Sequence, residues 1–429
     1  MPPHAFRALR HRNFRIFFAG QLVSLVGTWM QQVAQSWLIY RLTGSPLLLG
    51  AIGFAGQFPI FLLGPIGGHV ADRYDRRRVL IATQSVSMLL AFTLAFLTLS
   101  DNIAEWHLFV LAVLLGLVNA FDLPARQAFL SQMVEREDLI NAIALNSSMF
   151  NGARIAGPAI AGILVATIGE GWCFFVNAVS YVAVIAGLLL MTVPRFIAAP
   201  ATKSMWGNVA EGFRFVALTP PVRALMVLIG VVSFTALPYT VLMPIFADRI
   251  FHSGSRGLGI LMGAAGAGAL LGSIALALRS HVFGLGRWVA IACAVFGGSL
   301  VAFSFSRNFM LSAAILCLSG GAMMVQMASS NTLVQSMVPD ELRGRVMAVY
   351  SMMFMGMGPL GALLAGSLAE SFGAPVTVAT GGAITVLAAI VFSLRLPALR
   401  GPGRELILAQ QAGPGDPQQQ TTATGAEGR

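Results

Sequence analysis

The chain is made of long apolar runs, each of about 20 residues or more, separated by short polar segments. A run of this length crosses a bilayer when it is helical. Helices suit that environment because they satisfy every backbone polar group within the segment itself. Of the 429 residues, 56% are hydrophobic and 10% are charged, whereas a soluble domain carries roughly 25% charged residues. The pattern therefore predicts an all-α membrane protein.

Twelve runs are long enough to span a membrane, six on each side of a polar interval near the middle of the chain. The predicted spans are 14–40, 46–70, 78–100, 105–133, 140–168, 171–193, 222–247, 256–279, 287–306, 309–337, 343–370 and 374–396. An even number of spans places both termini on the same side. We expect an N-terminal bundle over 1–193, a linker over 194–221, a C-terminal bundle over 222–396 and a tail over 397–429.

The distribution of positive charge predicts which side faces the cytoplasm. Arg41, Arg249, Arg256 and Arg307 fall in loops on one side, and Arg154 lies within a span. The rest of the 27 Lys and Arg residues lie on the side of the termini and of the loop at 64–78. Cytoplasmic loops collect Lys and Arg, so this side is expected to be cytoplasmic. The net charge of +10 is thus explained by topology and does not indicate a nucleic-acid partner.

The linker and the tail have different compositions. In the linker, Trp206, Val209 and Phe213 recur at helical spacing, opposite Lys203 and Arg214. This pattern is typical of an amphipathic helix that lies on the membrane surface. The tail from Pro397 is rich in Gly, Pro and Gln, and such a composition buries too little apolar surface to fold. We expect it to be disordered.

The two halves of the chain are related by an internal repeat. At one common offset Gly68 corresponds to Gly272 and Gly116 to Gly320, and at a slightly smaller one Gly157 corresponds to Gly358. Repeats of this kind build many transporters from two related bundles. The sequence predicts two pseudo-symmetric six-helix bundles.

The loop between the second and third spans carries a specific pattern. It reads GPIGGHVADRYDRRR, with the core Gly68-x-x-x-Asp72-Arg73-x-x-Arg76-Arg77. This core resembles motif A of the major facilitator superfamily, which lies in the cytoplasmic loop between helices 2 and 3. The resemblance implies a gate in which the glycine permits close helix approach and the charged residues form hydrogen bonds. The alternative is that the arginines only follow the positive-inside rule.

The second copy of this motif is degraded. Leu276 stands at the position that corresponds to Asp72, although Arg279 and Arg287 keep the loop basic. Any gate built on motif A is therefore expected to be asymmetric.

The first span carries a polar face. Its members recur at steps of three and four residues, which places them on one side of a helix. They are Gln21, Ser24, Thr28, Gln31 and Gln35. Polar side chains are poorly placed against lipid, so this face is predicted to line an internal cavity. The alternative is that it supplies hydrogen bonds between helices.

Asp122 is the one carboxylate deep inside a predicted span. Such a residue is a functional candidate and needs a partner. Three arginines compete: Arg126 is nearest in sequence, Arg154 lies at a similar depth in the fifth span, and Arg76 is implied by the family resemblance as part of a charge relay. The repeat places the neutral Gln326 opposite Asp122, as a further candidate for the cavity wall. Asp122 is either a proton carrier or a structural part of the gate.

The fifth span contains Gly157, Pro158 and Gly162 within GARIAGPAIAG. This segment is similar to motif C, the antiporter signature of drug exporters, but it ends in Gly162-Ile163 where the usual form has two glycines. Glycine permits close helix packing, and proline favours a bend. Ordinary packing of small residues is the alternative explanation.

A closer likeness is carried by FRALRHRNFRIFFAGQLVSLVGTWMQQVAQSWL near the start and by NAFDLPARQAF in the fourth span. Over residues 5–396 the chain resembles the branch of major facilitator exporters that contains the enterobactin exporter and macrolide efflux proteins. The resemblance implies a monomeric exporter of small organic molecules in the bacterial inner membrane. It would work by alternating access and proton antiport, with a small molecule, a proton and the bilayer as partners and with no cofactor or metal.

Two alternatives within membrane biology stay open: a lipid or lysolipid transporter, and a sensor that does not transport. An enzyme is not expected, because the sequence shows no nucleophile, metal cluster or paired carboxylates. The six histidines are scattered, and Cys173, Cys293 and Cys317 are far apart. No arginine cluster marks a site for a polyanion.

Overall fold

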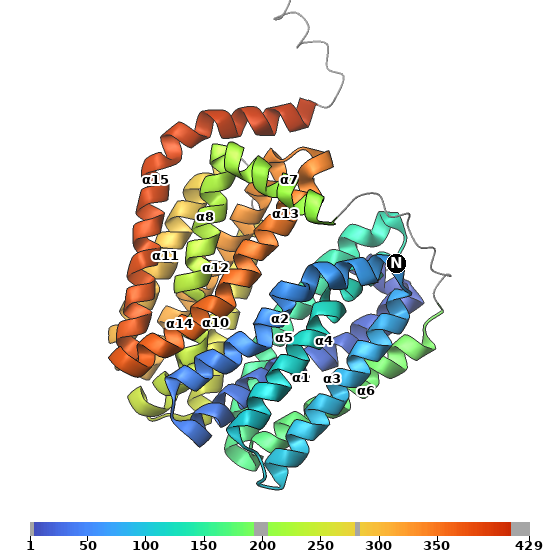
Figure 1. The fold of residues 1–429 in the computed structure, drawn as a ribbon, viewed down its shortest axis with the longest axis vertical. Helices are drawn as coiled ribbons and strands as arrows, with labels where there is room; N and C mark the ends of the chain where they lie inside the picture. Colours follow the sequence, from blue (N-terminus) through green and yellow to red (C-terminus); the bar gives the residue numbers. More distant parts are fainter. Residues whose placement is uncertain (1–3, 193–204, 279–283, 413–429) are drawn as a thin grey trace, which may run out of the picture.

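The computed structural model describes residues 4–192, 205–278 and 284–412. Within these ranges the chain forms helices and short turns, and no β strands. Figure 1 shows two helical bundles, one from the first half of the chain and one from the second. The predicted all-α membrane fold with two related halves is confirmed.

The first bundle follows the predicted spans within a few residues. A short 3₁₀ helix, η1 (His4–Arg10), precedes it, and another, η2 (Arg136–Asp138), lies in the α4–α5 loop. Its main helices are α1 (Arg12–Thr43), α2 (Pro46–Arg73), α3 (Arg76–Leu99), α4 (Glu105–Leu130), α5 (Leu139–Ile168) and α6 (Glu170–Leu190). Asp75 caps α3, because its carboxylate accepts from the backbone N–H groups of Arg77 and Arg78 at 2.9 and 3.3 Å.

The second bundle contains more interruptions. Its helices are α8 (Pro220–Thr235), η3 (Leu237–Leu242), α9 (Met243–Ile245), η4 (Phe246–Ile250), α10 (Gly254–Ala277), α11 (Leu285–Phe305), α12 (Phe309–Met337), α13 (Asp340–Ser351), η5 (Met352–Gly356), α14 (Met357–Phe372) and α15 (Ala374–Ala412). The predicted span 222–247 is thus not one regular helix. Pro238 and Pro244 lie where α8 gives way to a 3₁₀ turn and then to α9, since proline lacks the backbone donor that a helix needs.

Eleven helical segments of the described chain are long and apolar enough to cross a membrane. The helix α1 is not one of them, although it has 32 residues and packs against α5 and α6. Its polar face and its arginines lower its apolar character. The twelfth span therefore stays a prediction.

Helix pairing repeats between the halves. In the first bundle α2 packs on α4 and α3 on α6, while in the second α10 packs on α12 and α11 on α15. The bundles meet through two further pairs, α5 with α10 and α2 with α14, which are equivalent under the internal repeat. The fold is pseudo-symmetric, as predicted.

Contacts between the bundles are tight at one end. Gly162 of α5 faces Gly259 of α10, and Gly50 of α2 faces Gly366 of α14. A Cβ on Gly162 or on Gly50 would lie 3.0 Å from the Cα of its partner. This end, opposite the Gly64–Arg78 loop, is called the far end, and the other the motif A end. In Figure 1 the bundles diverge from the far end toward the end that carries the N-terminus and α7.

The linker helix is α7 (Met205–Leu218), and the preceding residues 193–204 lie outside the described ranges. It packs on α13, where a Cβ on Gly212 would meet the carbonyl oxygen of Arg345. Glu211 forms an ion pair with the Arg345 guanidinium. Phe213, predicted to belong to the apolar face, is 40% exposed, while Val216 is buried. The structure thus has a helix in the linker, and its place on the membrane surface stays a prediction.

The tail begins later than the sequence indicated. The helix α15 continues through Pro397 and Pro402 to Ala412, and Figure 1 shows its end turned across the bundle. Leu396 and Ile407 are buried. The expectation of disorder from Pro397 is wrong as far as Ala412, because the apolar ELIL segment supplies a face that packs. Residues 413–429 lie outside the described ranges.

Candidate functional site

A buried polar cluster surrounds Asp122 where α4 packs on α3. The side chain of Asp122 is 1% exposed. Its Oδ1 accepts hydrogen bonds from Thr83 Oγ1 and from Gln84 Nε2, each at 2.7 Å. Its Oδ2 pairs with the Arg126 guanidinium, one helical turn further along α4. Of the arginines that compete for this carboxylate in the sequence, Arg126 forms the ion pair.

The second bundle keeps this arrangement without charge. Gln326 of α12 is fully buried, and its Nε2 lies 3.5 Å from Ser330 Oγ. This pair has the same four-residue spacing as Asp122 and Arg126. The Oε1 atom of Gln326 has no hydrogen-bond partner among the described residues. The polar centre is therefore charged in one bundle and neutral in the other.

The motif A arginines are held by backbone carbonyls. Arg76 donates from Nε to Ala71 O at 3.0 Å and from Nη1 to Ala128 O at 3.2 Å, which joins α3 to α2 and α4. Arg77 donates to the carbonyl oxygens of Leu188 and Leu189 at the end of α6, at 2.6 and 2.8 Å. These bonds fix the motif A loop to the first bundle.

The acid and the glycine of motif A are less enclosed. The Asp72 side chain is 73% exposed and lies 3.7 Å from Arg76 Nη2, and Arg73 is exposed. A Cβ on Gly68 would meet nothing within 4 Å, whereas a Cβ on Gly67 would overlap the carbonyl oxygen of Ala120. In this structure, therefore, Gly67 and not Gly68 permits the close approach of α2 to α4.

The polar face of α1 divides into two parts. Gln21, Ser24 and Gln31 are buried, and Gln31 Oε1 accepts a hydrogen bond of 2.6 Å from Asn177 Nδ2 of α6. Thr28 is exposed, and Gln35 is half-buried. Gln31 thus supplies a hydrogen bond between helices, while Thr28 and Gln35 are the members of this face with accessible surface.

The motif C-like residues of α5 have separate tasks. Gly157 allows α5 to approach α1, because a Cβ there would overlap Trp29 Cβ. Pro158 is buried, and its carbonyl oxygen faces Gly259 of α10. Gly162 forms the contact between bundles described above. These small residues hold α5 against α1 on one side and against the second bundle on the other.

Polar contacts join the bundles at the far end. Tyr40 of α1 donates to Asp248 Oδ2 at 3.1 Å and accepts from Arg249 Nε at 3.0 Å. Arg249 also donates to Gly44 O at 3.2 Å. Ser45 Oγ donates to Glu370 Oε2 of α14 at 2.9 Å. These contacts are called the far-end seam.

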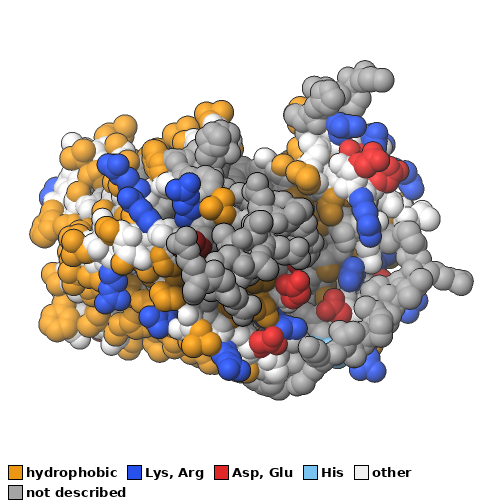
Figure 2. Space-filling view, turned by 90° about the horizontal axis from the view of Figure 1, so that it is seen from above, with side chains coloured by type: hydrophobic (Ala, Val, Ile, Leu, Met, Phe, Trp, Pro, Cys, Tyr) orange, Lys and Arg blue, Asp and Glu red, His pale blue; other side chains and the backbone are white. Residues whose placement is uncertain are grey.

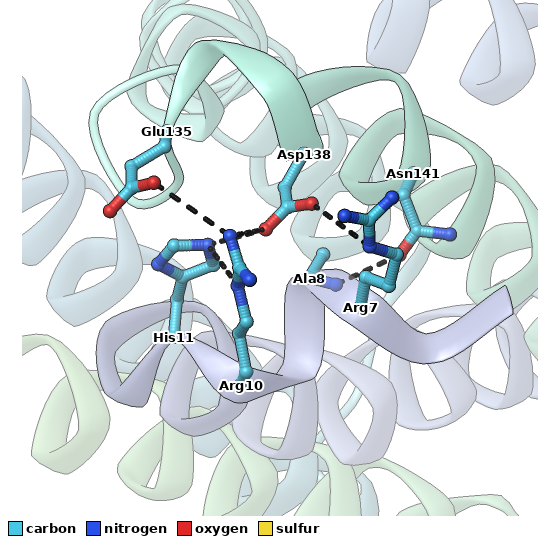
Figure 3. A network of polar contacts seen from close by, with 7 residues as sticks. All are labelled: Arg7, Ala8, Arg10, His11, Glu135, Asp138 and Asn141. Carbon is cyan, nitrogen blue, oxygen red and sulfur yellow. Dashed lines mark hydrogen bonds and ion pairs between the residues drawn. The ribbon is translucent and has the colours of Figure 1, made fainter. Parts of the chain in front are cut away.

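The N-terminal arginines also have structural partners. Figure 3 shows Asp138, in the α4–α5 loop, facing η1 and the residue after it. Its carboxylate lies 2.8 Å from His11 Nε2, 2.9 Å from Arg10 Nη2 and 3.9 Å from Arg7 Nε. The hydrogen bond with His11 lowers the pKa of Asp138; burial opposes this, and the charges of Arg10 and Arg7 add to it. The N-terminus is thereby tied to the loop that follows α4.

Arg154 of α5 lies apart from Asp122. Its guanidinium carbon is 5.9 Å from the centre of the Trp29 ring of α1. Tyr239 of η3, in the second bundle, is within electrostatic range of it. Arg154 is half-buried and, within the described ranges, forms no ion pair. It is a cation that lies between the two bundles.

Several of these residues were not predicted from the sequence. No sequence pattern marks Thr83 and Gln84 as partners of Asp122, because only the packing of α3 on α4 brings them to its carboxylate. Tyr40, Asp248 and Arg249 lie at span ends, where polar residues are common.

Among the residues that the structure describes, no three His, Cys, Asp or Glu side chains are grouped as metal ligands.

Comparisons with known proteins identify relatives over most of the chain. The model of the family described as "Transmembrane secretion effector" matches residues 4–406. The staphyloferrin A transporter of Staphylococcus aureus is 27% identical over 88% of this chain and 95% of its own length. The multidrug efflux pump Tap of Mycolicibacterium fortuitum is 30% identical over 84% of this chain and 90% of its own length. The enterobactin exporter EntS of Shigella boydii is 24% identical over 91% of this chain and 93% of its own length.

Solved structures share the fold at lower identity. The nucleoside transporter NupG superposes with a TM-score of 0.68 at 16% identity, covering 90% of this chain and 98% of its own. A second structure is that of a bacterial homologue of the lysosomal transporter Spinster, in an inward-facing and unoccupied conformation. It superposes with a TM-score of 0.66 at 16% identity, covering 96% of this chain and 99% of its own. These likenesses support the fold alone.

Proposed function

The chain belongs to the transmembrane secretion effector family of the major facilitator superfamily, and from this we propose that it exports small amphipathic organic molecules. Two relatives carry siderophore names and one is a multidrug efflux pump. We place the transporter in the bacterial inner membrane with the motif A end in the cytoplasm. Figure 2 views the molecule from the end that carries α7, and Lys and Arg side chains are spread over it, as the positive-inside rule requires.

We further propose that transport proceeds by alternating access. The observation that carries this proposal is the asymmetry between the two ends: the far-end seam and the Gly162–Gly259 contact close one end. With the motif A end in the cytoplasm, this arrangement is inward-facing. The related packing of α5 on α10 and of α2 on α14 gives the bundles two equivalent surfaces about which to rock.

Motif A would then act as a latch in the other state. Asp72 is exposed here, and Gly68 has open space around it. Both are available to the second bundle if the motif A end closes. Arg76 and Arg77 are bonded to carbonyl groups of the first bundle, so they keep the loop rigid. The latch would stabilise the outward-open state.

Coupling to protons is proposed to use Asp122. Its carboxylate accepts two hydrogen bonds and one ion pair in a buried place. A proton on Oδ2 would remove the ion pair and release the Arg126 guanidinium. Because Arg126 lies on the same helix, this change is local to α4, close to the carbonyl group of Ala128 that Arg76 binds.

Counterflow in proteoliposomes tests the transport function. Purified protein is reconstituted with one unlabelled compound inside, and uptake of the same labelled compound is followed for a panel of siderophores, macrolides and lysolipids. We expect accelerated exchange for at least one siderophore or drug. Exchange of lysolipids alone would contradict the proposal and favour a lipid carrier, and no exchange of any compound would favour a sensor.

A further inference from the structure

Among the residues that the structure describes, Arg154 is a cation with no anion bonded to it. It lies within the membrane-spanning part of α5, eleven positions before Val165 and fourteen before the end of the helix at Ile168. Arg126 of α4, by contrast, has the Asp122 carboxylate as its partner. In the described part of the chain no carboxylate and no carbonyl group is bonded to the Arg154 guanidinium. A guanidinium at membrane depth is costly unless a partner or water compensates it.

The neighbours of Arg154 leave room for an external partner. Trp29 faces the guanidinium through its ring, and such a contact stabilises a cation without neutralising it. Tyr239, a phenol of the second bundle that is 4% exposed, lies within electrostatic range of the guanidinium. Arg154 is only half-buried, so part of its surface remains accessible. Asp122 cannot serve as partner, because Arg126, Thr83 and Gln84 already occupy it.

The position between the bundles adds a second argument. Trp29 and Arg154 belong to the first bundle, and Tyr239 belongs to the second. The Arg154 backbone also lies against Gly266 of α10, where a Cβ would be 3.0 Å from the Arg154 carbonyl oxygen. A ligand bound here would therefore contact both moving parts, which is where an alternating-access transporter needs its substrate.

We propose that Arg154 binds an anionic group of the transported substrate, and that the substrates are organic monoanions, such as carboxylates, with an apolar or aromatic body. This inference rests on the proposed export function and specifies its substrate class. The guanidinium presents paired N–H donors that match a carboxylate. Trp29 offers an aromatic surface beside the anionic group. One fixed cation neutralises one negative charge, so a polyanion would carry uncompensated charge into the membrane, and a cation would be repelled.

Three fluorescent probes with one common body test the charge preference. Dansylglycine is an anion, dansylamide is neutral and dansylcadaverine is a cation. Binding is measured with purified full-length protein in nanodiscs by fluorescence enhancement, with empty nanodiscs subtracted. We expect dansylglycine to bind at least about tenfold more tightly than dansylamide, since a hydrogen-bonded charge pair contributes that much or more. Equal affinities, or tighter binding of dansylcadaverine, would overturn the proposal.

Variants assign the preference to Arg154. Arg154→Gln should abolish the difference between dansylglycine and dansylamide, because a neutral side chain cannot pair with the carboxylate. Arg154→Lys should retain part of the difference, because it keeps the charge and loses the paired donors. Arg307→Gln removes an exposed cation from the far end and should change nothing. A preference that survives in Arg154→Gln would refute the role of Arg154.

The two levels of the proposal fail differently. If wild-type proteoliposomes exchange dansylamide and dansylcadaverine but not dansylglycine, the protein is a transporter and the anion site is wrong. If dansylglycine binds with the expected preference but is never exchanged, the anion site stands and the export function fails. Because the wild-type preference is measured without any variant, a poorly folding Arg154→Gln protein would not remove the test.

Discussion

Replacing Tyr40 with Phe removes the hydroxyl that joins two residues of the second bundle to α1. That hydroxyl donates to Asp248 and accepts from Arg249, at 3.1 and 3.0 Å. The ring itself is buried and remains in place. The variant therefore weakens the far-end seam without opening a cavity, and it should raise the population of the outward-open state.

The magnitude follows from the two lost bonds. A hydrogen bond to a charged group contributes about 1.5–3 kcal/mol when it is shielded from water. Here Arg249 is exposed and retains its bond to Gly44 O at 3.2 Å. Solvent screening therefore places the combined loss well below the sum of two such bonds, at about 1.4 kcal/mol, which is close to the lower limit for a single bond. A loss of this size corresponds to roughly a tenfold change in the ratio of inward-facing to outward-open molecules.

Pulsed electron paramagnetic resonance measures this ratio as distances between spin labels. One pair, at Ser100 and Arg307, spans the far end, and a second, at Glu137 and Glu341, spans the motif A end; all four residues are exposed. In Tyr40→Phe the far-end distribution should gain a longer component while the motif A distribution gains a shorter one. Tyr350→Phe is the matched control, because its hydroxyl donates to Met327 O within one bundle. Unchanged distributions in Tyr40→Phe would refute the assignment of the seam as a gate.

Three further perturbations probe the other parts. Asp72→Asn should lower the outward-open population several-fold in the same measurement, and a population equal to wild type would remove Asp72 from the latch. Gly162→Leu should prevent closure of the far end, because even a Cβ at this position would lie 3.0 Å from Gly259 Cα. Gly152→Leu is the control, since Gly152 lies on the same helix with open space around it. Equal transport rates in the two variants would contradict the packing argument. The pKa of Asp138 is held below its ordinary value of 3.8, so the stability that it supplies is present above that value and is lost as the pH falls through the lowered pKa. Asp138→Asn should therefore melt at a lower temperature than wild type at pH 7, with the gap closing in strong acid, and equal melting temperatures at pH 7 would refute this contribution.

Local patterns were predictable from the sequence. Asp122 and Arg126 are one turn apart on the same helix, so their ion pair required only the helix itself. The two-bundle fold followed from apolar runs and from the repeated glycines. The linker helix was likewise visible as an apolar pattern at helical spacing.

Contacts set by helix rotation were not predictable. Gly67 and Gly68 are adjacent, and only the orientation of α2 against α4 decides which of them allows close approach. The Asp122 donors on α3 and the Tyr40–Asp248 bond join segments far apart in the chain, where periodicity carries no information. The extension of α15 was missed because a short apolar segment is flanked by Gly, Pro and Gln.

Proton flux coupled to substrate exchange tests the central claim most directly. Proteoliposomes carry a pH-sensitive dye inside, and a substrate from the counterflow panel is added outside. Wild type should move protons opposite to the substrate. Asp122→Asn should lose this flux while it retains counterflow, and Glu135→Gln, which changes an exposed carboxylate of the α4–α5 loop, should behave as wild type. Undiminished proton movement in Asp122→Asn would contradict the account.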